Sequence, residues 1–237
     1  MNIVVHPAHT RGHSHYGWLD TWHTFSFAHY FNPERMNFGA LRVLNDDTVQ
    51  GGKGFDRHPH ENMEIVSIPL AGALEHQDSM GNRAVIREGD VQIMSAGTGV
   101  VHAEYNGSAH EPVSFLQIWV FPKQQNITPR YDQRTFRKED RQNRWQQIVS
   151  PVQTDEGVWI NQDAWFYRAR LDEGRELTYA LHRSGHGVYL FLIEGSVTVN
   201  DTMLNKRDGA GISGAEKIDF TANRPAELLL IEVPLTF

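Results

Sequence analysis

Two pairs of side chains that can bind a metal ion lie in separate segments of the chain. The segment GFDRHPHENMEIV contains His58 and His60, and the segment SAGTGVVHAEYN contains His102 and Glu104. Residues two apart in a β-strand point to the same face, so each pair can reach one ion if its segment is extended. Pro59 lacks an N–H group, which places the first pair at a strand start or edge. Two such pairs on neighbouring strands predict one metal site with four ligands.

Imidazole and carboxylate are the only strong metal ligands that this chain offers. It has no cysteine, which removes thiolate ligands, disulfides and cysteine nucleophiles. On an octahedral metal, three nitrogens and one carboxylate leave positions open for a substrate or dioxygen, a pattern related to non-haem Fe(II) oxygenases. We expect one divalent ion, Fe(II) in the first place, with Zn, Mn, Ni, Co or Cu as alternatives because they accept the same donors.

The elements that must position these ligands are short strands. Segments rich in Val, Ile, Phe and Tyr, such as MEIVSIPLAG, VSFLQIWVFP and GVYLFLIEG, alternate with Gly, Asn and Asp turns, which is typical of an all-β sandwich or barrel. The order of elements repeats, since AGALEHQ precedes REGDVQIMSAG as EGSVTVN precedes KRDGAGISGA. We therefore predict two related β-barrels, residues 1–137 with the metal site and residues 138–237.

The second barrel is predicted to be metal-free. When the glycines that end the corresponding strands are aligned, Leu181 and Arg183 occupy the positions of the first His pair. His182 and His186 restore a partial pair only if the alignment slips by one residue, and no segment like HAE follows. We expect a structural role for this half.

Charge and composition exclude several other classes of protein. The formal net charge is −7, whereas nucleic-acid binding depends on clustered Lys and Arg. The mixed run from Arg134 to Arg144 also contains acidic residues and is interpreted as part of a solvated linker. Because the first sixteen residues lack the apolar stretch of a secretory signal and all apolar runs are strand-sized, we expect a cytoplasmic protein without direct nucleic-acid or membrane binding.

The chain resembles the pirin family of the cupin superfamily over essentially its whole length, and resembles closely the bacterial members with quercetinase activity. The matching stretches are GWLDTWHTFSFAHYF, FGALRVLNDD, GFDRHPHENMEIV, EHQDSMGN, QIMSAGTGVVHAEYN and QIWVFP. The combination of HPH with GVVHAE is diagnostic. The resemblance implies a bicupin of two consecutive jelly-roll barrels, with an iron ion held by His58, His60, His102 and Glu104.

A second glutamate could also be the carboxylate ligand. The wider cupin pattern places its glutamate in the first motif, and Glu64 has that spacing after His58 and His60. The resemblance to pirins favours Glu104, which leaves Glu64 as a pocket residue that orients a ligand.

The resemblance implies a metal-dependent dioxygenase similar to quercetin 2,3-dioxygenase, which opens the ring of a flavonol with O2 and releases carbon monoxide. Glu104 would act as the base for the 3-hydroxyl proton, while the metal lowers the pKa of that hydroxyl. The alternative is a metal-binding redox or ligand sensor that acts through protein partners without turnover. A structural zinc barrel is disfavoured because structural zinc sites are usually closed by four ligands that include Cys.

Other histidines and aromatic residues are expected to be structural. His13 and His15 form a further HxH motif, but it has no carboxylate partner and lies beside glycines, which favours a surface or packing role. Phe55, next to the first His pair, is either a pocket wall or ordinary barrel packing. Core packing is also expected for the amino-terminal aromatic cluster, which consists of Trp18, Trp22, Phe25, Phe27, Tyr30 and Phe31.

Overall fold

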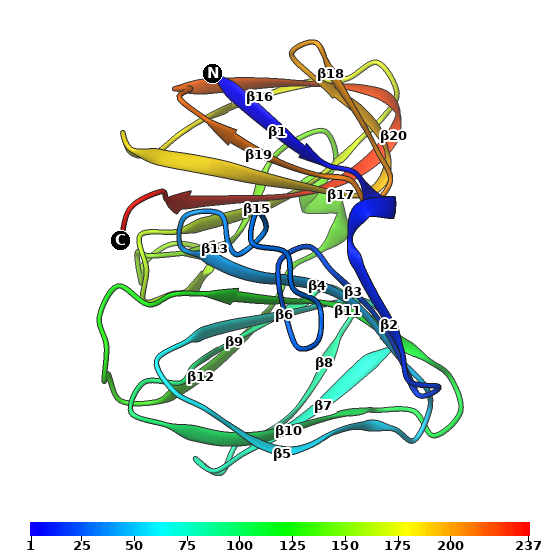
Figure 1. Cartoon of the computed structure of the whole chain (residues 1–237), viewed down its shortest axis with the longest axis vertical. Helices are drawn as coiled ribbons and strands as arrows, with labels where there is room; N and C mark the ends of the chain where they lie inside the picture. Colours follow the sequence, from blue (N-terminus) through cyan, green and yellow to red (C-terminus); the bar gives the residue numbers. More distant parts are fainter.

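The chain folds almost entirely into β-strands. The computed structural model describes all 237 residues and contains two short 3-10 helices but no α-helix. Figure 1 shows two β-barrel halves stacked along the long axis, with the carboxy-terminal strands above and the blue-to-green strands of the first half below. The expectation of an all-β chain with two barrels is confirmed. Neither helical segment has the length and hydropathy that crossing a lipid bilayer requires.

The first half consists of two facing sheets. One has seven strands in the order β12-β9-β6-β11-β4-β3-β2, and the other has four in the order β5-β10-β7-β8. The strands are β2 Gly12–His15, β3 Leu19–His23, β4 Leu41–Val49, β5 Gly54–His60, β6 Glu64–Ala71, β7 Ala73–Asp78, β8 Arg83–Arg87, β9 Asp90–Ser95, β10 Val100–Asn106, β11 Val113–Val120 and β12 Arg130–Thr135.

The second half is one nine-stranded sheet in the order β1-β19-β17-β20-β15-β13-β14, with β16 paired to β20 and β18 to β17. Its two longest strands, β17 and β20, pair from His186 opposite Pro234 to Val199 opposite Phe220, with three register shifts between. The elements are β1 Asn2–His6, β13 Gln146–Ser150, β14 Val158–Trp159, β15 Trp165–Leu171, β16 Glu176–Ala180, β17 His186–Val199, β18 Thr202–Asn205, β19 Gly209–Ser213 and β20 Lys217–Pro234, with the 3-10 helices η1 Ala8–Thr10 and η2 Lys138–Arg141.

The amino-terminal strand crosses between the halves. Strand β1 belongs to the first predicted range but pairs with β19 of the second half. Strand β12 does not cross, since it ends just before the predicted boundary and pairs with β9 of the first half, after which Phe136 donates its backbone N–H to the carbonyl oxygen of Gly89. The division at residue 137 stays a prediction, and β1 ties the two ranges together across it.

Strand alternation separates the two faces of the seven-stranded sheet. In β6, Ser67 points into the first barrel, where its hydroxyl donates to Glu104, whereas Val66 and Ile68 belong to the core between the two halves. In β4, Asn45 and Asp47 share the inward face because they are two residues apart. The inward face therefore carries a group of polar residues, and the outward face carries the apolar residues of the core that both halves share.

The two halves share one hydrophobic core. A cluster of 24 buried residues contains Ile68 and Leu116 of the first half together with Phe166, Phe191 and Ile231 of the second. All five are fully buried. Burial of apolar area is the main favourable term in folding, so each half is stabilised by contact with the other.

This shared core predicts a single cooperative unfolding transition. Phe191→Ala should lower the free energy of unfolding by about 3–5 kcal/mol because it leaves a cavity at the interface, as measured by urea denaturation followed by circular dichroism. Met203→Ala serves as the control, because the Met203 side chain is 61% exposed and such changes stay within about 0.5 kcal/mol. Two separate transitions in the wild-type protein would contradict the shared core.

Candidate metal centre

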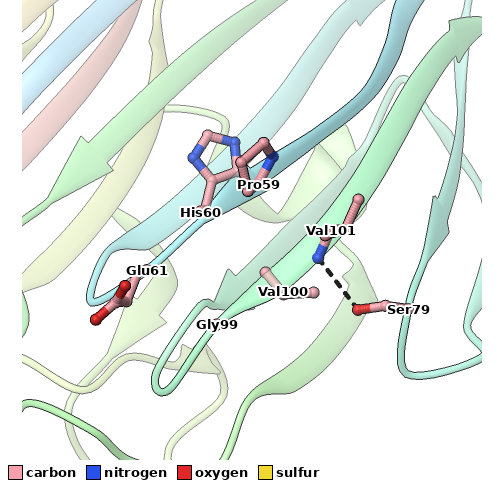
Figure 2. Close-up of a pocket in the computed structure, with 7 residues that line it drawn as sticks. All are labelled: Pro59, His60, Glu61, Ser79, Gly99, Val100 and Val101. Atoms are coloured by element: carbon pink, nitrogen blue, oxygen red, sulfur yellow. Dashed lines mark hydrogen bonds between the residues drawn. The ribbon is translucent and has the colours of Figure 1, made fainter.

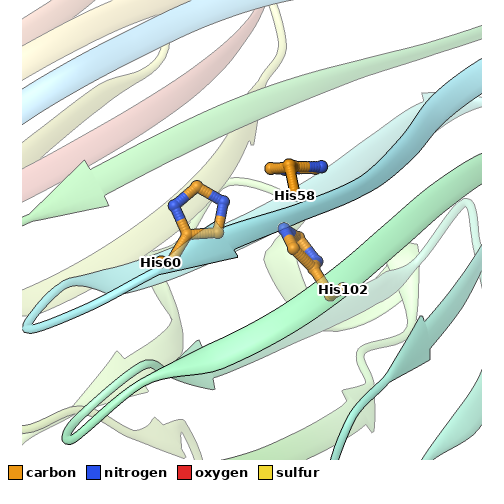
Figure 3. A group of neighbouring side chains, drawn as sticks. All are labelled: His58, His60 and His102. Carbon is orange, nitrogen blue, oxygen red and sulfur yellow. The ribbon is translucent and has the colours of Figure 1, made fainter.

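Pairing of β5 with β10 brings the three predicted histidine ligands together. His58 lies directly opposite His102 in this antiparallel pair, and His60 lies opposite Val100. The ring centroids are 4.4 Å apart for His58 and His102, 4.9 Å for His58 and His60, and 4.8 Å for His60 and His102. Figure 3 shows the three imidazoles facing one another across the two strands. One potential ligand atom of each lies within 4.8 Å of the others, so the group can hold a metal ion.

A register irregularity places the fourth predicted ligand. Between His102 and Glu104 the pairing of β10 with β5 shifts, which is the mark of a β-bulge and re-aims the following side chain. On its other edge β10 pairs regularly with β7, so Glu104 lies opposite His76. Glu104, His76 and His102 form a second group whose ligand atoms lie within 4.8 Å of one another. The two groups share His102.

The free ring nitrogens fit a metal ion. His58 Nδ1 is 2.7 Å from the backbone oxygen of Asp56, so it carries the proton and leaves Nε2 with a free lone pair. Both ring nitrogens of His102 are buried without a hydrogen-bond partner. An unpaired buried polar group is costly, and a cation at the centre of the group would satisfy it.

The electrostatics of the group also favour a bound cation. Burial, together with the neighbouring imidazoles of His58, His60 and His76, lowers the pKa of His102 to about 2. Burial and the charge of His58 likewise lower the pKa of His60 to about 4. Both rings are therefore neutral at pH 7, which is the form that binds metals.

Glu104 is held in place by two side chains on the facing sheet. Ser67 Oγ donates to Oε1 at 3.2 Å, and Gln117 Nε2 donates to Oε2 at 2.9 Å. Glu104 is 3% exposed, and burial raises its pKa to about 7 against the opposing effect of these two hydrogen bonds. A carboxyl group with this pKa exchanges its proton readily near neutral pH.

Glu64, the competing carboxylate, points away from the histidines. Its Oε2 accepts hydrogen bonds from Ser95 Oγ at 2.7 Å and from the backbone N–H of Asn161 at 3.1 Å. Asn161 belongs to the second half, so Glu64 lies at the interface between the halves. It takes part in neither group of potential ligands, and the reason is strand parity, because its neighbour Ile65 faces the barrel interior.

His76 is the residue that sequence reasoning missed. It is 1% exposed, its ring stands 5.3 Å from that of His102, and its Nε2 lies 3.1 Å from Asp78 Oδ2. The sequence prediction did not include it, because only the HPH and HAE segments were interpreted as ligand pairs. The only available signal was the alternation in LEHQD, which places His76 and Asp78 on one face of a strand.

Two hollows adjoin the histidines. Figure 2 shows the outer one, an open surface hollow of about 350 Å³ beside His60, where the Val101 N–H donates to Ser79 Oγ at 3.1 Å. The inner one is a cavity of about 80 Å³ within the barrel, and its lining comprises Phe27, Asn45, Asp47, Phe55, His58, His60, Glu104, Gln117 and Trp119. Phe55 is thus a wall residue. The expectation that Phe27 is only core packing was wrong, because it lines this cavity and contacts the Trp119 ring edge-on.

The remaining histidines have other partners. His13 is exposed and stacks on Trp22, which agrees with a surface and packing role. The expectation that it has no carboxylate partner was wrong, because its Nε2 lies 2.7 Å from Asp20 Oδ1. In the second half, Nδ1 of His182 and Nδ1 of His186 lie 2.9 and 3.0 Å from the carboxylate of Glu232, which is fully buried. The partial pair therefore converges on a carboxylate, and the absence of a metal in this half stays a prediction.

Comparison with known proteins agrees with this architecture. Residues 4–120 match the family model described as Pirin, and residues 147–233 match the model described as Quercetinase C-terminal cupin domain. A crystal structure of the bacterial pirin YhhW from Escherichia coli, in complex with nickel(II), superposes with a TM-score of 0.93 at 41% identity, covering 98% of this chain and 99% of that one. The expected bicupin fold is confirmed.

Full-length relatives agree as well. Quercetin 2,3-dioxygenase from Escherichia coli strain K12 is 42% identical over 232 residues, which is 98% of this chain and 99% of the relative. A Pirin-like protein from Caulobacter vibrioides is 42% identical over 227 residues, which is 95% of this chain and 97% of the relative. With both of its halves matched at this level and the HPH and HAE segments meeting in one barrel, the chain belongs to the pirin family.

Proposed function

We propose that this protein is a metal-dependent dioxygenase of the quercetin 2,3-dioxygenase type, which opens the ring of a flavonol with O2 and releases carbon monoxide. The observation that carries the proposal is the group of three imidazoles, with both nitrogens of His102 unpartnered, beside an aromatic-lined cavity. The relative from Escherichia coli that matches over nearly the whole chain is named quercetin 2,3-dioxygenase. Its name supports the assignment of this reaction.

For the metal site we propose His58, His60, His102 and Glu104 as ligands and Fe(II) as the native ion. Nickel in the related pirin structure fits the same nitrogen and oxygen donors, as Zn, Mn, Co or Cu would. A bound divalent ion would act as a Lewis acid toward the chelating oxygens of a flavonol. Glu64 is excluded from the proposed set because both of its hydrogen-bond partners lie at the interface between the halves.

Glu104 is the proposed base for the 3-hydroxyl proton of the flavonol. Burial raises the pKa of this carboxyl group in the metal-free protein, so the group would take up the proton when it dissociates from the ion. Gln117 and Ser67 hold the two carboxylate oxygens, so the side chain keeps its orientation before and after it takes the proton. Phe27, Phe55 and Trp119 surround the cavity with apolar surface, which excludes water from the reacting oxygens.

A flavonol and O2 are accordingly the small-molecule partners that we propose. The residues near the site offer aromatic surface and a few polar atoms, which is the usual composition of a small-molecule pocket. Partner proteins and a location in the cytoplasm stay predictions.

Two matched substitutions test the proposed ligand set. Glu104→Gln should lose most of its bound metal because the anionic donor is removed, whereas Glu64→Gln should retain it, although both residues are buried glutamates. The measurement is metal content by elemental analysis after purification without added metal, together with the affinity for Fe(II) and Ni(II). Near-full occupancy in Glu104→Gln, or loss of metal in Glu64→Gln, would overturn the assignment.

Removal of Gln117, a hydrogen-bond partner of Glu104, should weaken metal binding less than Glu104→Gln does. In Gln117→Leu, Oε2 of Glu104 loses its donor at 2.9 Å, and residues that orient a ligand typically contribute about 10–100-fold in metal affinity. Competition with a chelator measures this change. An affinity equal to that of the wild type would show that Gln117 does not orient the carboxylate.

Turnover tests the reaction itself. Metal-loaded wild-type protein should consume quercetin and O2 in air with release of carbon monoxide, and His58→Ala should be inactive. His13→Ala is the control, because His13 is an exposed histidine whose partners are Trp22 and Asp20. If the metal-loaded protein turns over no flavonol but its binding to partner proteins changes with the oxidation state of the metal, the sensor alternative is correct.

A further inference from the structure

A row of polar side chains crosses the inner face of the seven-stranded sheet in the first barrel. His23 lies opposite Asn45, Asn45 opposite Gln117, and Gln117 opposite Ser67, so four neighbouring strands contribute one residue each. All four are buried. Interior positions of small barrels are normally filled by apolar side chains, and buried polar groups require partners. Gln117 and Ser67 have their partner in Glu104.

At the other end of the row, residues of strand β3 orient their neighbours on strand β4. Thr21 lies opposite Asp47 and His23 lies opposite Asn45. The Thr21 hydroxyl donates to Asp47 Oδ1, and His23 Nδ1 lies 3.0 Å from Asn45 Oδ1. Burial lowers the pKa of His23, so the ring is neutral at pH 7 and donates to this oxygen through Nδ1. Asn45 and Asp47 are therefore each oriented by the residue of β3 that lies directly opposite.

These contacts leave one side-chain polar atom without a hydrogen bond on Asp47 and one on Asn45. Asp47 Oδ2 and Asn45 Nδ2 form no hydrogen bond within the protein, whereas the opposite atoms do. Both residues line the 80 Å³ cavity together with His58, His60 and Glu104. A free acceptor and a free donor thus border the same small space as the proposed metal ligands.

The size of the cavity limits which part of a ligand can reach these atoms. Since a water molecule takes about 30 Å³, a cavity of 80 Å³ admits only the edge of a polycyclic molecule. For a flavonol bound through its 3-hydroxyl and 4-carbonyl oxygens, the group that flanks this chelating edge is the 5-hydroxyl. In the free flavonol this hydroxyl donates to the 4-carbonyl oxygen, so in the complex it must turn away from the metal-bound carbonyl to donate to a protein acceptor, and its oxygen can accept a further hydrogen bond.

We propose, on the basis of the proposed function, that Asp47 and Asn45 bind the 5-hydroxyl of the flavonol and so select ligands that have a hydroxyl next to the chelating pair. Asp47 Oδ2 accepts the hydrogen bond from the hydroxyl, as a carboxyl oxygen can in either protonation state. Asn45 Nδ2 donates to the same oxygen. Thr21 and His23 keep these two atoms aimed into the cavity, so the binding site needs no rearrangement when the ligand enters.

A matched pair of ligands tests the proposal without any substitution. 3-Hydroxyflavone and 3,5-dihydroxyflavone share the 3-hydroxyl and 4-carbonyl pair and differ only in the 5-hydroxyl. Because the 5-hydroxyl also forms a second chelating pair with the 4-carbonyl, substitutions of Asp47 and Asn45 separate hydrogen bonding to the protein from chelation. Binding to metal-loaded wild-type protein without oxygen is measured from the absorption shift of the flavonol. The 5-hydroxy compound should bind about tenfold more tightly or better, because its hydroxyl meets a buried acceptor and donor. Equal affinities, or no binding of either compound, would overturn the proposal.

Substitutions then locate the selectivity. Asp47→Ala and Asn45→Ala should bring the affinity ratio close to one by weakening only the binding of 3,5-dihydroxyflavone, while Asp47→Asn, which keeps an acceptor, should retain part of it. Asp46→Asn is the control, because Asp46 lies on the outer face of the same strand and pairs with Arg11 at 3.3 Å. Thermal unfolding verifies that each variant is folded. A ratio that stays at the wild-type value in Asp47→Ala, Asn45→Ala and Asp47→Asn would refute the role of both residues.

Kinetic measurements separate this proposal from the proposed function. If both flavonols are turned over and bind equally well, the dioxygenase assignment stands and the selectivity fails. If the binding ratio is found but neither compound is consumed, the selectivity stands and the dioxygenase assignment fails.

Discussion

The antiparallel register of β5 against β10 is the constraint on which the rest of the site depends. It sets His58 directly opposite His102 and leaves His60 on the same face two residues away. A slip of one residue would turn both members of the His58 and His60 pair to the outside of the barrel. Because β10 also pairs with β7, this register brings His76 and Glu104 to the same place, and the bulge after His102 decides where the carboxylate points.

Three imidazoles and a carboxyl group inside a barrel are polar groups that need hydrogen-bond partners or a bound ion. The polar row on the facing sheet provides such hydrogen bonds, since Ser67 and Gln117 hold Glu104, while Thr21 and His23 hold Asp47 and Asn45. The stability of the first barrel therefore comes to a large extent from its outer face. There the apolar residues of β6 and β11 join the core that both halves share, and the second half stabilises a site to which it contributes no ligand.

The same alternation of faces explains why the glutamate of the wider cupin pattern is not near the histidines. Glu64 begins β6 on the face that meets the second half, where it bonds to Ser95 and to the backbone of Asn161. A carboxylate at that position links the two halves. In the second barrel another buried carboxylate, Glu232, is hydrogen-bonded by Tyr179 and His182, and His186 Nδ1 lies 3.0 Å from it.

The sequence by itself determined the all-β class, the two related barrels, the absence of thiolate chemistry and the two co-facial pairs, because alternation and ligand types are local properties of the chain. Only the tertiary structure decided that His76 lies at the site, that Glu64 faces the second half and not the pocket, and that Phe27 lines the cavity. It also decided that β1 crosses to the second half. These features depend on which strand pairs with which, in what register and with which bulge. Those relations join residues far apart in the chain, so local spacing does not contain them.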